Sequence, residues 1–170
     1  VSIGIDHFAR QSDNLSREPL ARNFQGYTTD AASALIGFGA SAISRLPQGF
    51  AQNDVAVDGY ARRLSLYGLA TARGAILTED DRVRSHVIER LMCAFSLSES
   101  DLTDRFGLAA SEVITISRAL VSNDIDGLVE ATGDGFKVTD TGKPFVRNIC
   151  ARFDAYLPQQ TEQRRHALAV

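Results

Sequence analysis

The chain has 170 residues, of which 44% are hydrophobic and 23% are charged, and its formal net charge is −3. This length and apolar content suffice for one ordinary domain or two small ones, which excludes an intrinsically disordered chain. The weakly acidic balance gives no general attraction for nucleic acid or anionic lipid, and no apolar run approaches the roughly 20 residues of a membrane span. We expect a cytoplasmic protein with no membrane or nucleic-acid partner.

The residues that commonly bind metals are few and scattered. Cys93 and Cys150 lie in helical patterns, where they are expected to be small buried hydrophobes of a reducing compartment rather than a disulfide. The two cysteines do not form a CxxC pair, and the three histidines, His7, His86 and His166, do not form a His-x-x-x-His helix face. The sequence therefore predicts no metal site, and we expect His86 and His166 to be solvated.

The first 75 residues combine strand and helix patterns. Residues 1–5, VSIGI, read as a buried strand ending in a loop with Asp6 and His7, where His7 could either face a ligand or fix the loop. Residues 36–44 read as a second buried strand, whose glycines would allow close approach to the main chain. Residues 58–68 predict a short helix, with Asp58 as N-cap and Gly68 after its end.

The segment ARNFQGYTTD, residues 21–30, has neither strand nor helix periodicity. An aromatic ring beside an amide, Phe24 and Gln25, is suited to a flat heterocycle, because the ring can stack while the amide both donates and accepts hydrogen bonds. Core packing remains the alternative for Phe24. For Tyr27 the two interpretations are evenly balanced.

From Thr78 the pattern becomes mainly helical. It predicts a helix starting near Thr78 and Asp81, a short helix from Ser98 or Ser100 to Gly107, a third helix over 110–126, a hairpin around TGDG, and a last helix from Thr141 to Pro158. This order is typical of a winged helix. The residues expected to point inward are Val83, Val87, Ile88, Leu91, Met92, Phe95, Leu102, Phe106, Val113, Ile116, Leu120, Ile125, Phe145, Ile149, Phe153 and Tyr156.

The charges argue against the DNA-binding role that a winged helix suggests. Residues 76–157 contain 14 acidic and 9 basic side chains, a net charge of −5. The expected recognition helix carries Glu112, Asp124 and Asp126 against the single basic residue Arg118. Because phosphate neutralisation supplies most of the affinity for DNA, a packing or covering role is favoured over DNA binding.

Five blocks, in order, carry a family resemblance. They are GIDHFAR, RNFQGYTT, LIGFGASAIS, LTEDDRVRSHVIERLMCAFSL and VTDTGKPFVRNICARFDAYL, and together they resemble the carboxyl-terminal part of the oxygen-independent coproporphyrinogen III oxidases, radical S-adenosylmethionine enzymes of haem biosynthesis. Haem chaperone-like relatives carry Asn-Phe where this chain has Asp6-His7. In place of NFQGYTT they carry a run that ends in Asn-Tyr-Trp. Both differences favour the oxidase.

The resemblance implies an α/β remnant of a partial (β/α) barrel over 1–75, a mainly α winged-helix-like covering domain over 76–157, and a tail over 158–170. In that family a 4Fe-4S cluster held by CxxxCxxC cleaves S-adenosylmethionine, and the resulting radical starts conversion of two substrate propionates to vinyl groups, giving protoporphyrinogen IX. Two S-adenosylmethionine molecules occupy the site. By position, Phe24, Gln25 and Ile43 match residues lining that cofactor, whereas Asp6 and His7 receive no firm role.

The cluster motif is absent from this chain, and so is the family's glycine-rich segment for the methionine end of the cofactor. We therefore interpret the chain, which starts at Val1, as a carboxyl-terminal fragment that is inactive alone, with no catalytic or metal residue of its own. Expected partners are the amino-terminal barrel of the same polypeptide, the tetrapyrrole and an unknown electron donor, in a monomer. The alternatives are a haem chaperone-like relative and a winged-helix interaction or DNA-binding module.

Overall fold

The computed structural model describes residues 1–157. It divides into two compact units, each described here by itself. The first unit comprises Val1–Asn23, Tyr27–Thr29 and the chain from Glu79 onward, and the second comprises Phe24–Gly26 and Asp30–Thr78. The mixed helix-and-sheet class expected from the sequence is confirmed, whereas the barrel-end and covering-domain boundaries stay predictions.

Two small hairpins begin the chain. β1 (Ser2–Ile3) pairs antiparallel with β2 (His7–Phe8), so that Ile3 lies opposite His7. A 3-10 turn, η1 (Asn14–Ser16), precedes the hairpin of β3 (Ala21–Asn23) and β4 (Gly26–Thr28). The predicted strand over 1–5 is wrong in length, because Gly4 adopts φ +59° and turns the chain back. As a result His7 lies in a strand rather than in a loop.

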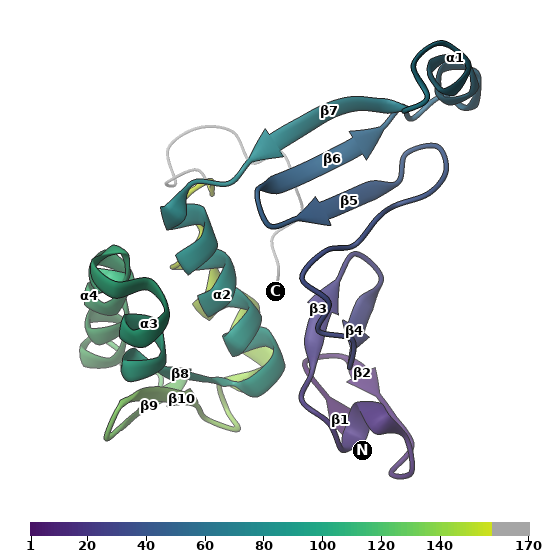
Figure 1. The fold of residues 1–170 in the computed structure, drawn as a ribbon. Helices are drawn as coiled ribbons and strands as arrows, with labels where there is room; N and C mark the ends of the chain where they lie inside the picture. Colours follow the sequence, from purple (N-terminus) through teal and green to yellow (C-terminus); the bar gives the residue numbers. More distant parts are fainter. Residues whose placement is uncertain (158–170) are drawn as a thin grey trace. The chain divides into compact units, whose positions relative to one another are not determined.

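The helical part of the first unit follows the expected order of elements. Its three-stranded antiparallel sheet has the order β8-β10-β9 and lies beside α3 and α4 (Figure 1). The elements are α2 (Glu79–Ala94), β8 (Ser96–Ser98), α3 (Glu99–Phe106), η2 (Gly107–Ala110), α4 (Ser111–Ser122), β9 (Val129–Thr132), β10 (Gly135–Val138), η3 (Lys143–Phe145) and α5 (Val146–Ala151).

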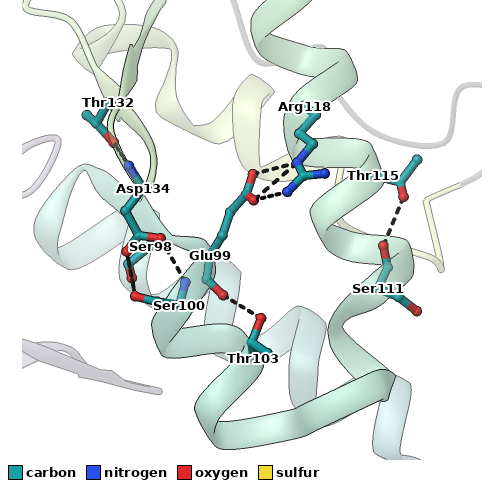
Figure 2. Close-up of polar contacts among 9 residues, drawn as sticks. All are labelled: Ser98, Glu99, Ser100, Thr103, Ser111, Thr115, Arg118, Thr132 and Asp134. Carbon is teal, nitrogen blue, oxygen red and sulfur yellow. Dashed lines mark hydrogen bonds and ion pairs between the residues drawn. The ribbon is translucent and has the colours of Figure 1, made fainter.

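Side-chain caps determine where α3 begins. The Ser98 hydroxyl accepts a hydrogen bond from the Asp101 amide at 3.0 Å, as expected of an N-cap, and donates to Asp134 Oδ2 at 2.6 Å. Asp134, in the turn between β9 and β10, also accepts from the Ser100 hydroxyl and amide (Figure 2). These bonds lower the pKa of Asp134. The hairpin turn and the start of α3 are thereby held together.

The core of the first unit confirms most of the predicted inward positions. Helix α2 contributes a buried stripe that packs against α5 and the sheet, and the cluster of buried residues is Val83, Val87, Leu91, Met92, Leu97, Leu102, Ala110, Val113, Val129, Phe136, Val138, Val146, Ile149, Cys150 and Phe153. Ile88, Phe95, Phe106, Ile116 and Leu120 are partly buried against it.

Three predicted core positions are wrong. Ile125 is 94% exposed because α4 ends at Ser122, three residues before it. Phe145 is also exposed and lies in η3, before α5 begins at Val146. Tyr156 is exposed because α5 ends at Ala151 rather than near Pro158. Pro158 itself lies outside the described residues, as does His166.

Polar contacts also tie the helices of this unit to one another. Arg84, on α2 and almost buried, donates to Asp80 and to Glu112 of α4 at 2.7 Å each, and to the Phe153 carbonyl at 3.3 Å. His86 is not solvated as expected, because its Nε2 lies 2.9 Å from Asp101 Oδ2 and only 15% of its side chain is exposed.

The second unit contains one sheet and one helix. The sheet has the antiparallel order β5-β6-β7, formed by β5 (Ile43–Leu46), β6 (Gly49–Asn53) and β7 (Thr71–Ile76). Between β6 and β7 lies α1 (Val57–Tyr67), which Gly68 ends with φ +71°. Asp58 was expected as its N-cap but lies in the first turn, and Ala56 holds the cap position without a side-chain bond.

The predicted buried strand over 36–44 is wrong for most of its length. Residues 36–42 form a loop, and only Ile43 and Ser44 belong to β5. Asn53 Nδ2 donates to the carbonyls of Gly37 and Gly39, which holds the loop against β6. Ser41 and Gly39 both have positive φ, a backbone conformation that interrupts strand pairing. The small residues of this segment therefore belong to an ordered loop and not to a strand.

The second unit has almost no core. Within the described residues, Ala70 is its only buried hydrophobic side chain, whereas ten of its large hydrophobics are exposed: Phe24, Ile36, Phe38, Val55, Val57, Leu64, Leu66, Tyr67, Leu69 and Ile76. Strand β7 is exposed at every position. Across residues 1–157, no helix is both long and apolar enough to cross a membrane.

Candidate cofactor site and the Asp6–His7 cluster

The structure brings Phe24 and Ile43 to the same side of the second unit's sheet. Phe24 lies at the tip of the β3–β4 hairpin, and its ring meets the Phe50 ring edge-on at 5.9 Å between centroids. In β5 and β6, Ile43 pairs with Gln52 and Arg45 with Phe50. Because side chains alternate between faces, Ile43 and Phe50 share one face, on which the Phe24 ring rests.

The exposure of these side chains is compatible with ligand binding. Phe24 is 55% exposed, so its ring is not part of a hydrophobic core within this chain. Gln25, beside it in the turn, is exposed, and Ile43 is half-buried. Nearby on the same face, Arg73 donates to Gln52 Oε1 at 2.7 Å. An apolar platform with polar groups at its border is the kind of surface on which a flat heterocycle can lie.

The Asp6–His7 pair belongs to a cluster in the first unit. His7 Nδ1 lies 2.8 Å from Asp6 Oδ1, and Arg147 of α5 reaches the other carboxylate oxygen at 3.4 Å. The bond with His7 lowers the pKa of Asp6, with Arg147 acting in the same direction. The His7 ring meets the Tyr27 ring edge-on at 5.0 Å. Tyr27 thus has a packing role next to the pair.

Sequence reasoning missed two of the residues that complete these arrangements. Phe50 lies in a strand that the pattern GFAQN did not reveal, although an aromatic next to a turn glycine was a usable signal. Arg147 is 141 residues from Asp6 along the chain. No local signal could have linked these two residues, since only the tertiary fold brings them together.

The two cysteines are unsuited to an iron–sulfur cluster. Burial raises the pKa of the Cys93 thiol to about 11 and that of Cys150 to about 12, which disfavours the thiolates that ligate iron. Cys150 lies in the hydrophobic core. Among residues 1–157 there is no group of three or more His, Cys, Asp or Glu side chains that could hold a metal ion. These residues do not fit a cluster.

Comparison with protein-family models identifies a domain family that part of this chain resembles. Residues 77–145 match the family model of the HemN C-terminal domain. The matched segment includes all of α2, β8, α3, α4, β9 and β10.

The relatives extend the match over nearly the whole chain. Oxygen-independent coproporphyrinogen III oxidase of Bradyrhizobium diazoefficiens is 44% identical over 92% of this chain and 36% of its own length. That of Escherichia coli is 38% identical over 99% of this chain and 38% of its own length. The predicted resemblance is confirmed: the chain is a relative of the oxygen-independent coproporphyrinogen III oxidases, spanning little more than a third of their length.

A solved structure agrees with these sequence matches. Coproporphyrinogen III oxidase (HemN) from Escherichia coli, described as a radical SAM enzyme, superposes with a TM-score of 0.82 at 39% identity. The match covers 91% of this chain and 37% of that one. Most of this chain is therefore similar in fold to a part of that enzyme.

Proposed function

We propose that the chain is the carboxyl-terminal part of an oxygen-independent coproporphyrinogen III oxidase, which converts two propionates of coproporphyrinogen III to vinyl groups. The proposal rests on the similarity over nearly the whole chain to enzymes of that name. The chain contributes only a portion of the site, with the amino-terminal radical SAM barrel of the same polypeptide supplying the rest. The full-length protein is a cytoplasmic monomer in this proposal, and the chain alone is inactive.

One observation supports a cofactor-binding role for this portion. The exposed Phe24 ring lies on the sheet face that carries Ile43, with Gln25 beside it. In the proposed site Phe24 stacks on the adenine of S-adenosylmethionine, Gln25 hydrogen-bonds it, and Ile43 contacts it through apolar surface. When bound, S-adenosylmethionine and a 4Fe-4S cluster supply hydrogen-atom abstraction from the propionate. The cluster ligands come from outside this chain.

The acidic helical part has a covering role in this proposal. We regard residues 76–157 as a winged-helix-like domain that limits the access of water to the site, because water exclusion suppresses side reactions of reactive intermediates. Its α4 is poorly suited to DNA. The single basic residue of that helix, Arg118, donates three hydrogen bonds to Glu99, two from Nε at 3.1 Å and one from Nη2 at 2.5 Å (Figure 2), so it is already paired within the protein.

Binding of S-adenosylmethionine to the full-length protein tests the proposed cofactor site. We expect Phe24→Ala to weaken binding between about tenfold and a hundredfold, since loss of one base–aromatic stack costs about 1–3 kcal/mol. Gln25→Ala should weaken it about fivefold through loss of hydrogen bonds. Equilibrium binding of the cofactor, with iron content measured in parallel, provides the readout.

Matched controls separate this role from general effects on folding. Phe38→Ala removes an aromatic ring that is 88% exposed in the same unit, and Gln48→Ala removes an exposed amide at the β5–β6 turn. Both should bind S-adenosylmethionine like the wild type. If Phe24→Ala and Gln25→Ala both bind S-adenosylmethionine as tightly as the wild type, the proposed adenosine site is wrong. Haem binding without turnover of coproporphyrinogen III would instead favour a haem chaperone-like relative.

A further inference from the structure

The proposed cofactor site does not use the Asp6–His7 cluster, although its geometry is that of an oriented histidine. Asp6 holds His7 through Nδ1, which leaves Nε2 as the ring nitrogen that can meet a ligand. The His7 side chain is 45% exposed and that of Asp6 is 55% exposed, so the pair is accessible. In a charged imidazolium both ring nitrogens are donors, so Nε2 can donate to a ligand while Nδ1 donates to Asp6.

Packing fixes the position of the His7 ring. Its edge-on contact with Tyr27 is maintained because the Tyr27 hydroxyl donates to the Met92 carbonyl at 3.0 Å, which anchors the β3–β4 hairpin to α2. Gly4 makes this approach possible, since a Cβ there would lie 2.0 Å from the Tyr27 ring. The histidine is therefore held by two hairpins and a helix rather than by one mobile loop.

The cluster also carries a second cation. Arg147 contacts Asp6 through a single long hydrogen bond of 3.4 Å, and its side chain is 56% exposed. The Arg22 guanidinium lies over the Tyr27 ring, 4.7 Å from its centroid. The Asp6 carboxylate offsets only one positive charge, so with His7 protonated the trio Asp6, His7 and Arg147 has a net charge of +1. Such a group attracts an anion, and a guanidinium matches the planar geometry of a carboxylate.

We propose that His7 and Arg147 bind a propionate carboxylate of the tetrapyrrole substrate, with Asp6 as the positioning residue between them. This inference rests on the proposed function, because the substrate class comes from the relatives' activity. His7 Nε2 and the Arg147 guanidinium donate to the carboxylate oxygens. Charge-assisted bonds of this kind select a tetrapyrrole with free carboxylates over one whose carboxylates are blocked.

The test uses the full-length protein and two porphyrin probes. Coproporphyrin III presents four free carboxylates, and its tetramethyl ester presents the same ring with none. We expect the wild type to bind the acid more tightly than the ester in a fluorescence titration. His7→Gln and Arg147→Met should each weaken binding of the acid about tenfold and leave ester binding unchanged, because each removes one charge-assisted hydrogen bond. Arg147→Lys should recover part of the loss.

Arg105→Met is the matched control, because the Arg105 side chain is also 56% exposed and also forms one long ion pair, with Asp101 at 3.8 Å. It should leave the acid-to-ester affinity ratio unchanged. Circular dichroism checks that each variant folds, and either folded variant suffices for the test. An unchanged ratio in His7→Gln and Arg147→Met, or a wild type that does not distinguish acid from ester, overturns the inference.

Different experimental outcomes would refute the proposed function and the proposed carboxylate site. Turnover of coproporphyrinogen III by the wild type, with an unchanged acid-to-ester ratio in the variants, refutes the carboxylate site and leaves the proposed function standing. No turnover by the wild type, with a ratio that still falls in the variants, refutes the proposed function and retains a carboxylate-binding cluster.

Discussion

At the scale of single residues, the pair of His86 and Asp101 connects two helices through one hydrogen bond. His86 of α2 and Asp101 of α3 are 2.9 Å apart, and the His86 ring also meets the Phe106 ring edge-on at 5.5 Å. The bond lowers the pKa of Asp101 below its ordinary value, against a smaller opposing effect of burial. A carboxyl group with a lowered pKa in the folded state makes stability depend on pH.

The direction of that dependence follows from the lowered pKa. The stabilising contribution of Asp101 is fully present above its ordinary pKa, about 3.9, and is lost as the pH falls through the lower folded value. We expect the free energy of unfolding to fall less steeply between about pH 5 and about pH 2 in Asp101→Asn than in the wild type. Denaturant titrations at several pH values measure this slope.

Asp104→Asn serves as the control for this measurement. Asp104 is exposed on the same helix, and its side chain forms no hydrogen bond or ion pair with the described residues. Its variant should keep the wild-type slope. Equal slopes in wild type and Asp101→Asn would mean that the contact with His86 contributes nothing to the pH dependence.

At the scale of elements, the start of α3 depends on a side chain that serves both the helix and the hairpin. Ser98 caps the helix and donates to Asp134. Ser98→Ala should therefore destabilise the protein by about 1 kcal/mol, the usual cost of losing an N-cap. Chemical denaturation provides the measurement, and Ser98→Thr, which retains the hydroxyl, should recover most of the loss. Full stability in Ser98→Ala would contradict the capping role.

The elements that sequence reasoning predicted well are those whose signals are local. The stripe of Val83, Val87 and Leu91 requires only helical spacing, and the hairpin at TGDG requires only turn chemistry. Strand β7 and the loop over 36–42 gave no such signal. β7 is exposed on both faces, so it has no apolar alternation. The run of small residues over 36–42 is equally typical of a strand and of a tight loop.

The candidate site was predictable in composition but not in geometry. Phe24 and Gln25 were identified from their residue types, and Ile43 only through the family resemblance. That Phe24 rests on Phe50 depends on the antiparallel register of β5 and β6, which no local pattern specifies. Asp6 and His7 were visible as neighbours, whereas their partner Arg147 required the complete fold.

At the scale of the whole molecule, the hydrophobic core is confined to one of the two units. Since burial of apolar surface is the main favourable term in folding, the unit with Ala70 as its only buried hydrophobic side chain has little to stabilise it in this chain alone. We expect amide hydrogens of β5, β6 and β7 to exchange at least about a hundredfold faster than those of α2. Hydrogen–deuterium exchange with mass spectrometry measures both in one experiment.

The same measurement on the full-length protein is the control. There the exchange of β5–β7 should slow towards that of α2, because the rest of the polypeptide covers these strands in the proposed enzyme. Strong protection of β5–β7 in the isolated chain would show that the sheet is stable without such a cover.

The unpaired edge of β7 affects the tendency of this polypeptide to aggregate. Among the described residues β7 pairs on one side only, with β6, and a strand with a bare edge beside exposed apolar side chains invites pairing with other chains. In the full-length enzyme that we propose, a copy that left this edge uncovered would therefore be prone to aggregation. Covering of that edge would distinguish a correctly folded copy of the proposed enzyme from a truncated or misfolded one.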